Sequence, residues 1–405
     1  STFQDLGYSY ESNAVISPDG SNPARLAYGD VLLSGILAAG VERLNPNVPA
    51  DAREQAIRQI SITETPSLVE ENRRIHRLIT EGVDVEFGIG DGEVKGDKVW
   101  LIDFEHPEKN EFLVTNQFTV AEGKHTRRPD VIVFVNGLPL GIIELKNAAS
   151  KTATVDQAYR QLQTYKEQIP SLFRANAVMV ASDGMLARIG SLTADEERFM
   201  PWRSVTGADG DFMPHGPYEM DTLLRGVFDK ERFLALIRDF TVFGDRGEGP
   251  FKIIAGYHQF HGARKAITSA IEAVKPDGDR KIGVIWHTQG SGKSLLMAFL
   301  GGLIVRSRAL ENPTLIVLTD RNDLDDQLFG TFSLCKDLIR QTPEQADSRD
   351  DLRKLLNRAS GGVIFTTVQK FTPEKGEEVF PVLTERRNVI VMADEAHRSQ
   401  YGFDS

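Results

Sequence analysis

The glycine-rich stretch at residues 287–294, HTQGSGKS, has the residue types that bind phosphate. Backbone N–H groups of such a loop, together with the N-terminus of a following helix, form a cradle for anions. Lys293 would reach the β- and γ-phosphates of ATP, and the Ser294 hydroxyl would ligate Mg²⁺. His287 departs from the strict GxxxxGK[ST] pattern, so a plain glycine-rich turn is the alternative. We expect nucleotide contacts from Gly290, Ser291, Gly292, Lys293 and Ser294.

An acidic motif near the end of the sequence supports this interpretation. Asp394-Glu395-Ala396-His397 directly follows the apolar run at 388–393. An α/β sheet presents ligand-binding side chains at the carboxyl ends of its parallel strands. Asp394 would hold Mg²⁺ through water, and Glu395 would orient or deprotonate the attacking water. A solvated helix start is the alternative, because acidic residues also suit that position.

Residues upstream of the loop are candidates for contacting the base of a nucleotide. Tyr257-His258-Gln259 precedes a helical run. Tyr257 would stack on adenine, and Gln259 would read its edge. A polar helix cap explains the same residues equally well. His258 and His261 have no carboxylate or cysteine companion at metal spacing, so we treat them as packing or surface histidines.

Two carboxylates and a lysine in the first half of the chain suit a different chemistry. Asp130 opens one expected strand, and the returning strand ends in Glu144-Leu145-Lys146. Because side chains alternate along a strand, Glu144 and Lys146 share a face. Asp130 and Glu144 would bind Mg²⁺ for phosphodiester hydrolysis, while Lys146 would orient the attacking water and help to deprotonate it. A self-neutralising Glu–Lys ion pair is the alternative.

The register of this hairpin decides whether Asp130 joins the other two side chains. Asn136-Gly137 is the strongest short-range hairpin signal in a sequence. A two-residue loop there would turn Asp130 to the wrong face. A three-residue loop, 135–137, with its glycine left-handed, would pair Asp130 with Ile142 and align it with Glu144. We predict the three-residue loop.

Further polar side chains on helices could support this site. Gln161 and Tyr165 lie one turn apart on an expected helix, where they would contact DNA phosphate or hold the carboxylates. An amphipathic packing helix is the alternative. Glu70 or Glu71 could add a metal-facing carboxylate, although a solvated helix face explains both residues as well.

Basic residues beside the site would favour DNA. Lys124, Arg127 and Arg128 add the local positive charge that binding to a DNA backbone needs. The formal net charge of the whole chain is −11. This value argues against a generic basic nucleic-acid coat, but an acidic protein can still bind DNA through a local basic cleft.

Hydrophobic periodicity predicts the elements that position these side chains. We expect helical segments at 67–81, 155–168, 221–243, 292–305 and 323–329. We expect strands at 99–104, 112–120, 130–146 (as a hairpin), 177–181, 281–286, 314–319, 361–368 and 388–393. In the second half, strands alternate with helices, which predicts a parallel sheet with helices on both faces. The predicted fold class is α/β.

Length and composition limit the class of protein. A chain of 405 residues exceeds one ordinary domain. A glycine-containing stretch at 244–249 marks a boundary, and we divide the chain into residues 1–235 and 236–405. Hydrophobic residues at 40% and charged residues at 26% exclude wholesale disorder and coiled-coil rods. The only cysteine, Cys335, and the absence of a long apolar run predict a cytoplasmic protein without a membrane segment.

Taken together, these stretches resemble the restriction subunit of type I restriction-modification enzymes over nearly the whole chain. The stretches that carry the resemblance include RRPDVIVFVNGLPLGIIELK at 127–146, VIWHTQGSGKSLLM at 284–297 and ADEAHRSQYG at 393–402, and taken jointly they are highly specific. The resemblance implies a PD-(D/E)xK nuclease domain over residues 1–235. It also implies that residues 236–405 hold the first of two RecA-like domains of a superfamily 2 motor.

The resemblance also assigns residues. It matches Asp130, Glu144 and Lys146 to the nuclease residues of that family, and Gln161 with Tyr165 to its QxxxY element. It matches residues 290–294 and 394–397 to motor motifs I and II. It matches Thr319, Arg321 and Thr366 to strand-end motifs implicated in DNA contact or coupling.

The activity implied by this resemblance is ATP-driven translocation on double-stranded DNA, with cleavage at distant sites. ATP and Mg²⁺ would be the cofactors, and modification and specificity subunits would be the partners. Such motors bind ATP between two RecA-like domains, so we expect the present sequence to hold half of that site, with weak ATP binding and no translocation. The alternatives are a DNA-repair or other defence nuclease-helicase, and a motor with a non-catalytic docking domain.

Overall fold

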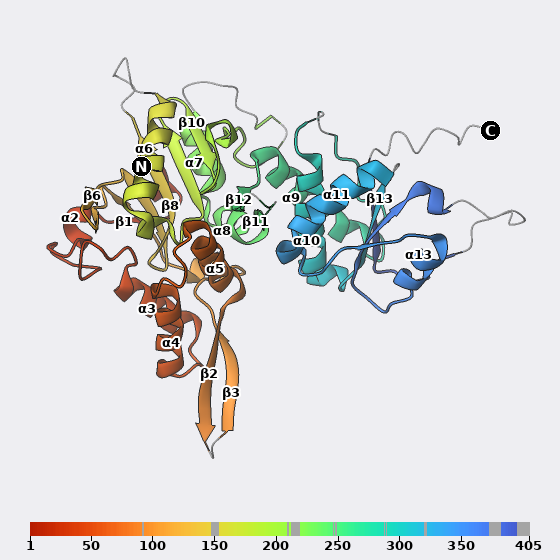
Figure 1. Ribbon diagram of the computed structural model, residues 1–405, viewed down its shortest axis with the longest axis horizontal. Helices are drawn as coiled ribbons and strands as arrows, with labels where there is room; N and C mark the ends of the chain where they lie inside the picture. Colours follow the sequence, from red (N-terminus) through yellow and green to blue (C-terminus); the bar gives the residue numbers. More distant parts are fainter. Residues whose placement is uncertain are drawn as a thin grey trace, which may run out of the picture. The chain divides into compact units, whose positions relative to one another are not determined.

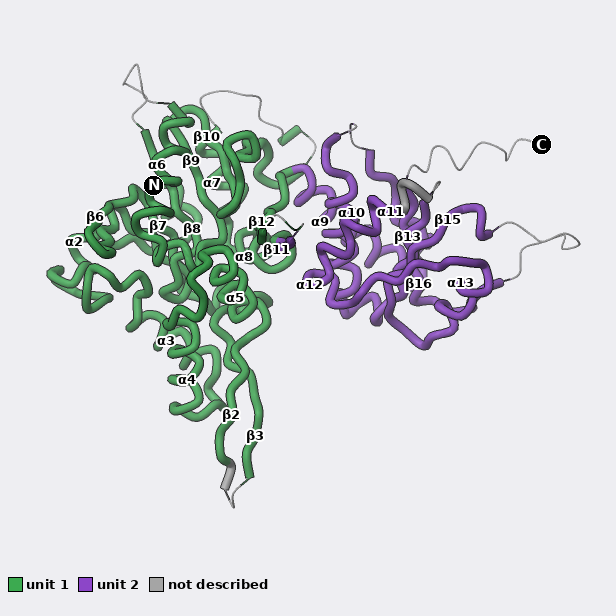
Figure 2. Tube along the Cα trace, in the orientation of Figure 1, with its two compact units in different colours: residues 1–241, 246–257 green, residues 242–245, 258–405 purple. Residues whose placement is uncertain are grey.

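The structure is a computed structural model that forms two compact units, coloured separately in Figure 2. Unit 1 comprises residues 1–241 and 246–257, and unit 2 comprises residues 242–245 and 258–405. The structure describes residues 1–90, 93–146, 154–208, 210–211, 219–245, 247, 249–286, 288, 290–319, 322–371 and 382–394. Both units combine helices with sheets that contain parallel strands, as the α/β class predicted.

Unit 1 is built on a six-stranded mixed sheet (Figure 1). In sheet order its strands are β1 (Ser9–Tyr10), β4 (Phe112–Asn116), β7 (Val131–Val135), β8 (Leu138–Leu145), β9 (Val178–Ser182) and β10 (Ala187–Gly190). β1 pairs with β4 and β8 pairs with β9 in parallel, whereas the other neighbours are antiparallel. The sheet therefore has β7 and β8, the expected hairpin, at its centre.

The helix α6 (Val155–Gln168) covers one face of this sheet. It begins at Thr154, whose hydroxyl accepts a hydrogen bond from the backbone N–H of Gln157 at 3.3 Å, as an N-cap residue does. Its apolar stripe, which includes Leu162, packs in one core with Ile142 of β8. The helix predicted at 155–168 is thus confirmed, and it lies beside the strand that carries Glu144.

The remaining elements of unit 1 surround the sheet. Its other helices are α1 (Thr2–Asp5), α2 (Asn13–Ile16), α3 (Ser34–Leu44), α4 (Ala50–Ser61), α5 (Leu68–Glu81), α7 (Glu219–Val227) and α8 (Lys230–Asp239). Short 3-10 turns are η1 (Pro107–Lys109), η2 (Pro170–Phe173) and η3 (Glu196–Arg198). The strands β11 (Thr241–Asp245) and β12 (Pro250–Ile254) and the helix α9 (Tyr257–Ala273) lie where the chain passes between the units. The helix predicted at 67–81 is confirmed by α5.

Two small hairpins were not foreseen. β2 (Val83–Gly90) pairs with β3 (Glu93–Val99), and β5 (Val120–Glu122) pairs with β6 (His125–Arg127). In Figure 1 the far end of the first hairpin extends beyond the rest of unit 1. The strand predicted at 99–104 is wrong, because Asn45 bonds both the backbone N–H and the carbonyl of Trp100, at 2.8 Å each, and turns the chain there.

Unit 2 contains a four-stranded parallel sheet in the order β14-β15-β13-β16. Its strands are β13 (Thr314–Thr319), β14 (Glu344–Gln345), β15 (Val363–Thr367) and β16 (Val389–Ala393). Its helices are α10 (Lys293–Arg306), α11 (Asn322–Leu334), α12 (Lys336–Ile339) and α13 (Arg349–Leu356), with turns η4 (Arg308–Leu310) and η5 (Val368–Phe371). Alternation of apolar strands and helices predicted this parallel sheet correctly.

One predicted strand of unit 2 does not form. Residues 281–286 belong to no strand, and Val284 and Trp286 are 90% and 94% exposed. Apolar, β-branched composition favours a strand, but a strand needs a hydrogen-bonded neighbour, and no described strand pairs with this segment. The apolar pattern alone was therefore insufficient here.

None of the helices in the described ranges is long and apolar enough to cross a lipid bilayer.

Candidate active site

The β7–β8 hairpin aligns Asp130 and Glu144 in a way that differs from the prediction. The loop has two residues, because Val135 pairs with Leu138, and both Asn136 and Gly137 have positive φ. The three-residue loop predicted at 135–137 is wrong. The type of turn follows from the Asn-Gly pair, since both central residues adopt left-handed backbone, as a type I′ turn requires.

A register shift inside the β7–β8 ladder nevertheless brings Asp130 to the same face of the sheet as Glu144. The pairing shifts between Val133, which lies opposite Gly141, and Phe134, which lies opposite Pro139. Proline lacks the N–H that a regular ladder would use, so a bulge beside it is the expected accommodation. Leu140 is the extra residue. Beyond it Val131 lies opposite Ile143, which places Asp130 opposite Glu144 instead of Ile142.

The Asp130 carboxylate is held by two donors. Its Oδ1 accepts a hydrogen bond from Gln117 Nε2 at 2.7 Å, and its Oδ2 accepts one from the backbone N–H of Leu145 at 2.8 Å. Each oxygen of an ionised carboxylate can accept more than one hydrogen bond or bind a cation as well. Asp130 is thus oriented while it retains capacity for a further ligand.

The Glu144 carboxylate is buried, with 3% of the residue exposed. Its Oε1 lies 2.7 Å from Lys146 Nζ, whereas its buried Oε2 has no hydrogen-bond partner among the residues that the structure describes. Burial raises the pKa of Glu144, Lys146 opposes that shift, and the charge of Asp130 adds to it. A buried carboxylate oxygen without a donor is costly, and a bound cation would satisfy it.

Of the two expected residues on α6, Tyr165 interacts with the carboxylates. Tyr165 is buried, and burial together with the charge of Glu144 raises the pKa of its phenol. Gln161 lies one turn earlier on the helix and is half-buried. Arg127 Nε donates to Gln168 Oε1 at 2.5 Å, which ties the end of β6 to the end of α6. The structure thus brings Tyr165 to Glu144 and Arg127 to the edge of the same helix.

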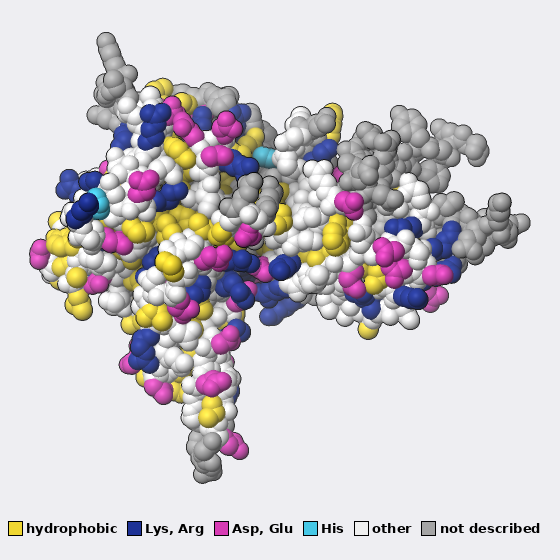
Figure 3. All heavy atoms as spheres, in the orientation of Figure 1, with side chains coloured by type: hydrophobic (Ala, Val, Ile, Leu, Met, Phe, Trp, Pro, Cys, Tyr) yellow, Lys and Arg dark blue, Asp and Glu magenta, His cyan; other side chains and the backbone are white. Residues whose placement is uncertain are grey.

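Basic side chains lie on the surface near this edge. Lys124 and Arg128 are exposed, and His125 between them is half-buried. Figure 3 shows Lys, Arg and His side chains gathered over β6. The local positive charge expected from the sequence is therefore presented to solvent.

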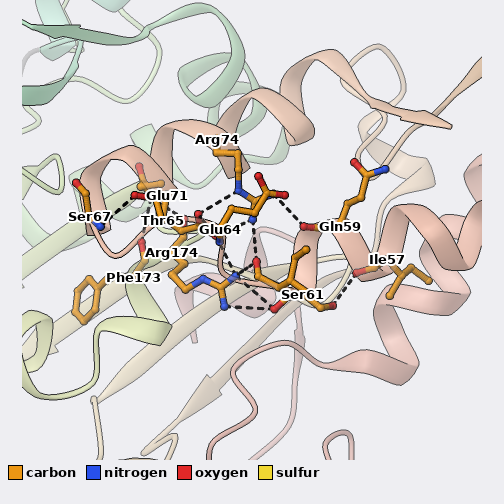
Figure 4. Close-up of polar contacts among 12 residues, drawn as sticks. Ile57, Gln59, Ser61, Glu64, Thr65, Ser67, Glu71, Arg74, Phe173 and Arg174 are labelled. Carbon is orange, nitrogen blue, oxygen red and sulfur yellow. Dashed lines mark hydrogen bonds and ion pairs between the residues drawn. The ribbon is translucent and has the colours of Figure 1, made fainter.

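Glu71 does not face a metal. It is 1% exposed, and its Oε1 lies 2.6 Å from Arg74 Nη2 and 3.2 Å from Arg174 Nη2 (Figure 4). Burial alone would raise the pKa of Glu71, but the hydrogen bond and charge of Arg74 and the charge of Arg174 lower it. Arg174 Nη2 also donates to the carbonyl of Ile62 at 2.5 Å. This carboxylate therefore joins the α4–α5 connection to η2 and is neither solvated nor available as a ligand.

The phosphate loop of unit 2 is held from α9. Gly292 has a φ of +79° and forms the N-cap of α10. Gln259 Nε2 donates to the Gly292 carbonyl at 3.1 Å, and His258 Nε2 lies 2.9 Å from the Ser291 carbonyl. Sequence reasoning assigned Gln259 to adenine; here its amide contacts the loop backbone.

Lys293 and Asp394 line the same cavity in unit 2. The cavity has a volume of about 830 Å³, and its wall includes apolar side chains such as Leu296 and Ile390. Asp394 follows β16, and its backbone N–H donates to the carbonyl of Leu318 on β13 at 2.9 Å. The lysine of one motif and the acid of the other therefore open onto a common space.

The other residues expected to contact DNA or nucleotide lie in different environments. Thr319 and Thr366 are buried at the ends of β13 and β15, where Thr319 Oγ1 donates to the Thr366 carbonyl at 3.4 Å. Tyr257 is half-buried in unit 1, where the centre of its ring lies 6.5 Å from that of Trp202 in a T-shaped arrangement. Arg321 and Glu395 lie outside the described residues. Roles for these residues in binding DNA or nucleotide stay predictions.

No group of three or more His, Cys, Asp or Glu side chains at metal-binding spacing occurs among the residues that the structure describes. The nuclease-like site thus offers two carboxylates. Sequence reasoning missed Gln117, which holds one of them. The only signal was the polar pair Asn116-Gln117 inside an apolar run, where β4 ends.

Each half of the chain is similar to a known protein family. Residues 1–198 match the family described as Type I restriction enzyme R protein N terminus, and residues 258–404 match the SWI2/SNF2 ATPase family. The type I restriction enzyme HindI endonuclease subunit of Haemophilus influenzae is 44% identical over 403 residues, which is 99% of this chain. The chain belongs to the type I restriction enzyme R protein family.

Other relatives of this R protein chain carry similar names. A protein of Methanocaldococcus jannaschii named as the type I restriction enzyme MjaIXP endonuclease subunit is 35% identical over 98% of the chain. A type I restriction enzyme endonuclease subunit of Staphylococcus aureus is 27% identical over 73% of the chain. The chain spans 38%, 39% and 30%, respectively, of the length of these three proteins.

Proposed function

We propose that the chain provides the nuclease and part of the ATP-driven motor of a type I restriction subunit, which cuts double-stranded DNA. The observation that carries this proposal is the position of Asp130 directly opposite Glu144, with Lys146 Nζ 2.7 Å from Glu144 Oε1. Two carboxylates and a lysine at the ends of the central strands of a mixed sheet suit the PD-(D/E)xK fold. The proposed DNA substrate also favours the cytoplasmic location expected from the sequence.

Asp130 and Glu144 would hold a magnesium ion. The buried Oε2 of Glu144, for which the described part of the chain offers no hydrogen-bond partner, fits such an ion. When bound, a magnesium ion would polarise the phosphate that is attacked. Gln117 and the Leu145 N–H hold Asp130 in one orientation, and Lys146 both neutralises Glu144 and carries protons that can hold an attacking water. Arg127 and Arg128 would contact DNA phosphates, and Gln161 and Tyr165 would support the carboxylates.

Unit 2 would be the first RecA-like domain of the motor. The loop at 290–294 would bind the phosphates of ATP, with Ser294 and Asp394 holding the magnesium ion of the nucleotide. The left-handed backbone of Gly292 and the shared cavity of Lys293 and Asp394 support this assignment. Tyr257 and Gln259 would approach the base, and Glu395 would orient water.

The partners would be double-stranded DNA and the modification and specificity subunits of the same complex. The names of the relatives, which call them endonuclease subunits of type I restriction enzymes, support this part of the proposal. Target recognition would then lie in another subunit.

Two substitutions in the intact protein with its partner subunits test the proposal. Asp130→Asn should abolish DNA cleavage and leave ATP hydrolysis unchanged, whereas Lys293→Ala should abolish ATP hydrolysis. Undiminished cleavage by Asp130→Asn would favour a docking role for unit 1. Full ATPase activity in Lys293→Ala would contradict the motor assignment.

A further inference from the structure

We propose that Gln117 is a positioning residue of the nuclease site, which orients Asp130 for metal binding. The inference rests on the proposed function and extends it to a residue outside the Asp130, Glu144 and Lys146 set. Its starting point is the 2.7 Å hydrogen bond from Gln117 Nε2 to Asp130 Oδ1.

Gln117 contacts Asp130 at two points. Its backbone N–H donates to the Asp130 carbonyl at 2.8 Å, and its side-chain amide donates to the carboxylate. The strand β4 pairs with β7 up to Asn116, which lies opposite Val131. Gln117 is thus the next position along this ladder. Continued by one residue past the paired ends of β4 and β7, this register aligns Gln117 and Asp130 in one row with Glu144 of β8.

The backbone of Gln117 is held in an unusual conformation. Its φ is +54°, a left-handed value that few residues other than glycine adopt. The next residue, Phe118, is fully buried in the core, and the guanidinium of Arg25 lies 3.7 Å from the centre of its ring. Arg25 Nη2 also donates to the carbonyl of Thr119 at 2.5 Å. These contacts hold the two residues that follow Gln117 in the core, next to the position from which the Gln117 amide reaches Asp130.

The chemistry of the contact defines its role. An ionised carboxylate only accepts hydrogen bonds, so the NH₂ group of Gln117 must face Asp130. Gln117 and the Leu145 N–H each occupy one carboxylate oxygen and stop the group from rotating. The unused lone pairs of Asp130 are thereby presented in one direction. Groups that orient a metal ligand in this manner typically contribute tenfold to a hundredfold to metal affinity.

The test compares matched substitutions at adjacent positions. Gln117→Met keeps the length of the side chain and removes the donor. Asn116→Met is the control, because the Asn116 side chain is exposed and accepts a hydrogen bond from Tyr10 instead. Gln117→Gly is a second variant that removes the side chain and suits the left-handed backbone, so it keeps the test valid if Gln117→Met does not fold.

Two measurements are needed. The first is Mg²⁺ binding by calorimetry without DNA or nucleotide, with Asp130→Asn defining the signal that belongs to this site. The second is the Mg²⁺ dependence of DNA cleavage by the intact protein with its partner subunits. We expect Gln117→Met and Gln117→Gly to weaken Mg²⁺ binding at the Asp130 site about tenfold, and high Mg²⁺ to restore cleavage. Asn116→Met should match the wild type.

The outcomes separate this inference from the proposed function. Wild-type Mg²⁺ affinity in both Gln117 variants would overturn the positioning role, even if Asp130→Asn is inactive. Wild-type cleavage by Asp130→Asn would overturn the nuclease assignment itself. An equal loss of Mg²⁺ affinity in Asn116→Met would show a general effect on the end of β4 and would also contradict the inference.

Discussion

In unit 1 the candidate carboxylates and Gln117 come from neighbouring strands of one sheet, whereas in unit 2 the candidate phosphate- and magnesium-binding residues come from a loop, a helix start and one strand end. The first site depends on hydrogen-bonded register, which sets Gln117, Asp130 and Glu144 in a row. The second depends on local backbone conformation, which Gly292 provides with its positive φ. A site of the first kind is sensitive to changes in strand pairing, and a site of the second kind to changes in a single turn.

Glu144→Gln should cause the largest of the predicted losses. It should affect the site in unit 1 and leave the site in unit 2 unchanged. Glutamine matches the shape of glutamate but lacks its charge, so DNA cleavage should fall about a thousandfold, equivalent to about 4 kcal/mol of lost stabilisation. ATP hydrolysis should not change. Cleavage and ATP turnover of the intact protein measure this, with the exposed Glu167→Gln as the control. Equal loss of both activities would mean that the two sites are not separate.

Gly141→Val should test the register itself. A Cβ atom at Gly141 would lie 3.1 Å from Phe228 and from Val133, so the bulged hairpin has no room for a larger side chain. We expect a loss of about 3 kcal/mol in the free energy of unfolding, measured with chemical denaturant. Gly96→Val is the matched control in β3, where a Cβ atom meets none of the described atoms within 4 Å. Similar stability in both variants would show that the hairpin tolerates repacking.

Lys252→Met should change how unit 1 responds to pH. Lys252 is buried, its Nζ donates to Asn72 Oδ1 at 3.0 Å and to the Asn176 carbonyl at 2.6 Å, and burial lowers its pKa to about 7. The cost of burying the ammonium is complete below this pH and disappears as the pH rises toward the ordinary lysine value of 10.5.

The stability of the wild type should therefore rise from about pH 7 to about pH 9, relative to Lys252→Met, by on the order of 2 kcal/mol. Thermal unfolding at each pH measures the difference. The exposed Lys98→Met should keep the slope of the wild type. The same slope in Lys252→Met and the wild type would show that Lys252 does not titrate in this range.

Gly292→Ala should cause the smallest of the predicted losses. This loss should be confined to ATP binding by unit 2. A Cβ atom at Gly292 would lie 2.5 Å from Gln259 Nε2, and its φ of +79° disfavours any side chain. We expect ATP binding to weaken about tenfold, because left-handed backbone costs roughly 1–2 kcal/mol outside glycine. Equilibrium titration with a fluorescent ATP analogue measures this. Gly330→Ala, whose Cβ atom would meet no neighbour within 4 Å in the described ranges, should bind ATP as the wild type does.

Much of the local structure was predictable from the sequence. Hydrophobic residues at helical spacing identified α5 and α6, whose N-caps in the structure are Ser67 and Thr154. The apolar runs identified β13, β15 and β16, because buried parallel strands are apolar on both faces. The segment 281–286 has the same composition but forms no strand, since composition does not supply a pairing partner.

The sequence predicted which residues belong to the candidate nuclease site, but it did not predict the strand pairing that brings them together. Strand alternation placed Glu144 and Lys146 on one face correctly. The pairing of Asp130 depended on a bulge next to Pro139, which the turn residues did not reveal. Glu71 shows the same difficulty, because its partner Arg174 is more than a hundred residues away in the chain.

The sequence by itself determined which side chains share a face of one helix or strand and where a glycine permits a left-handed turn. These properties depend on spacing and on local backbone preferences, which act within a few residues. The tertiary structure decided that Gln117 holds Asp130, that Asp130 lies opposite Glu144 and that Glu71 is paired with arginines. Such contacts depend on strand register and long-range packing, in which a shift of one residue changes every partner.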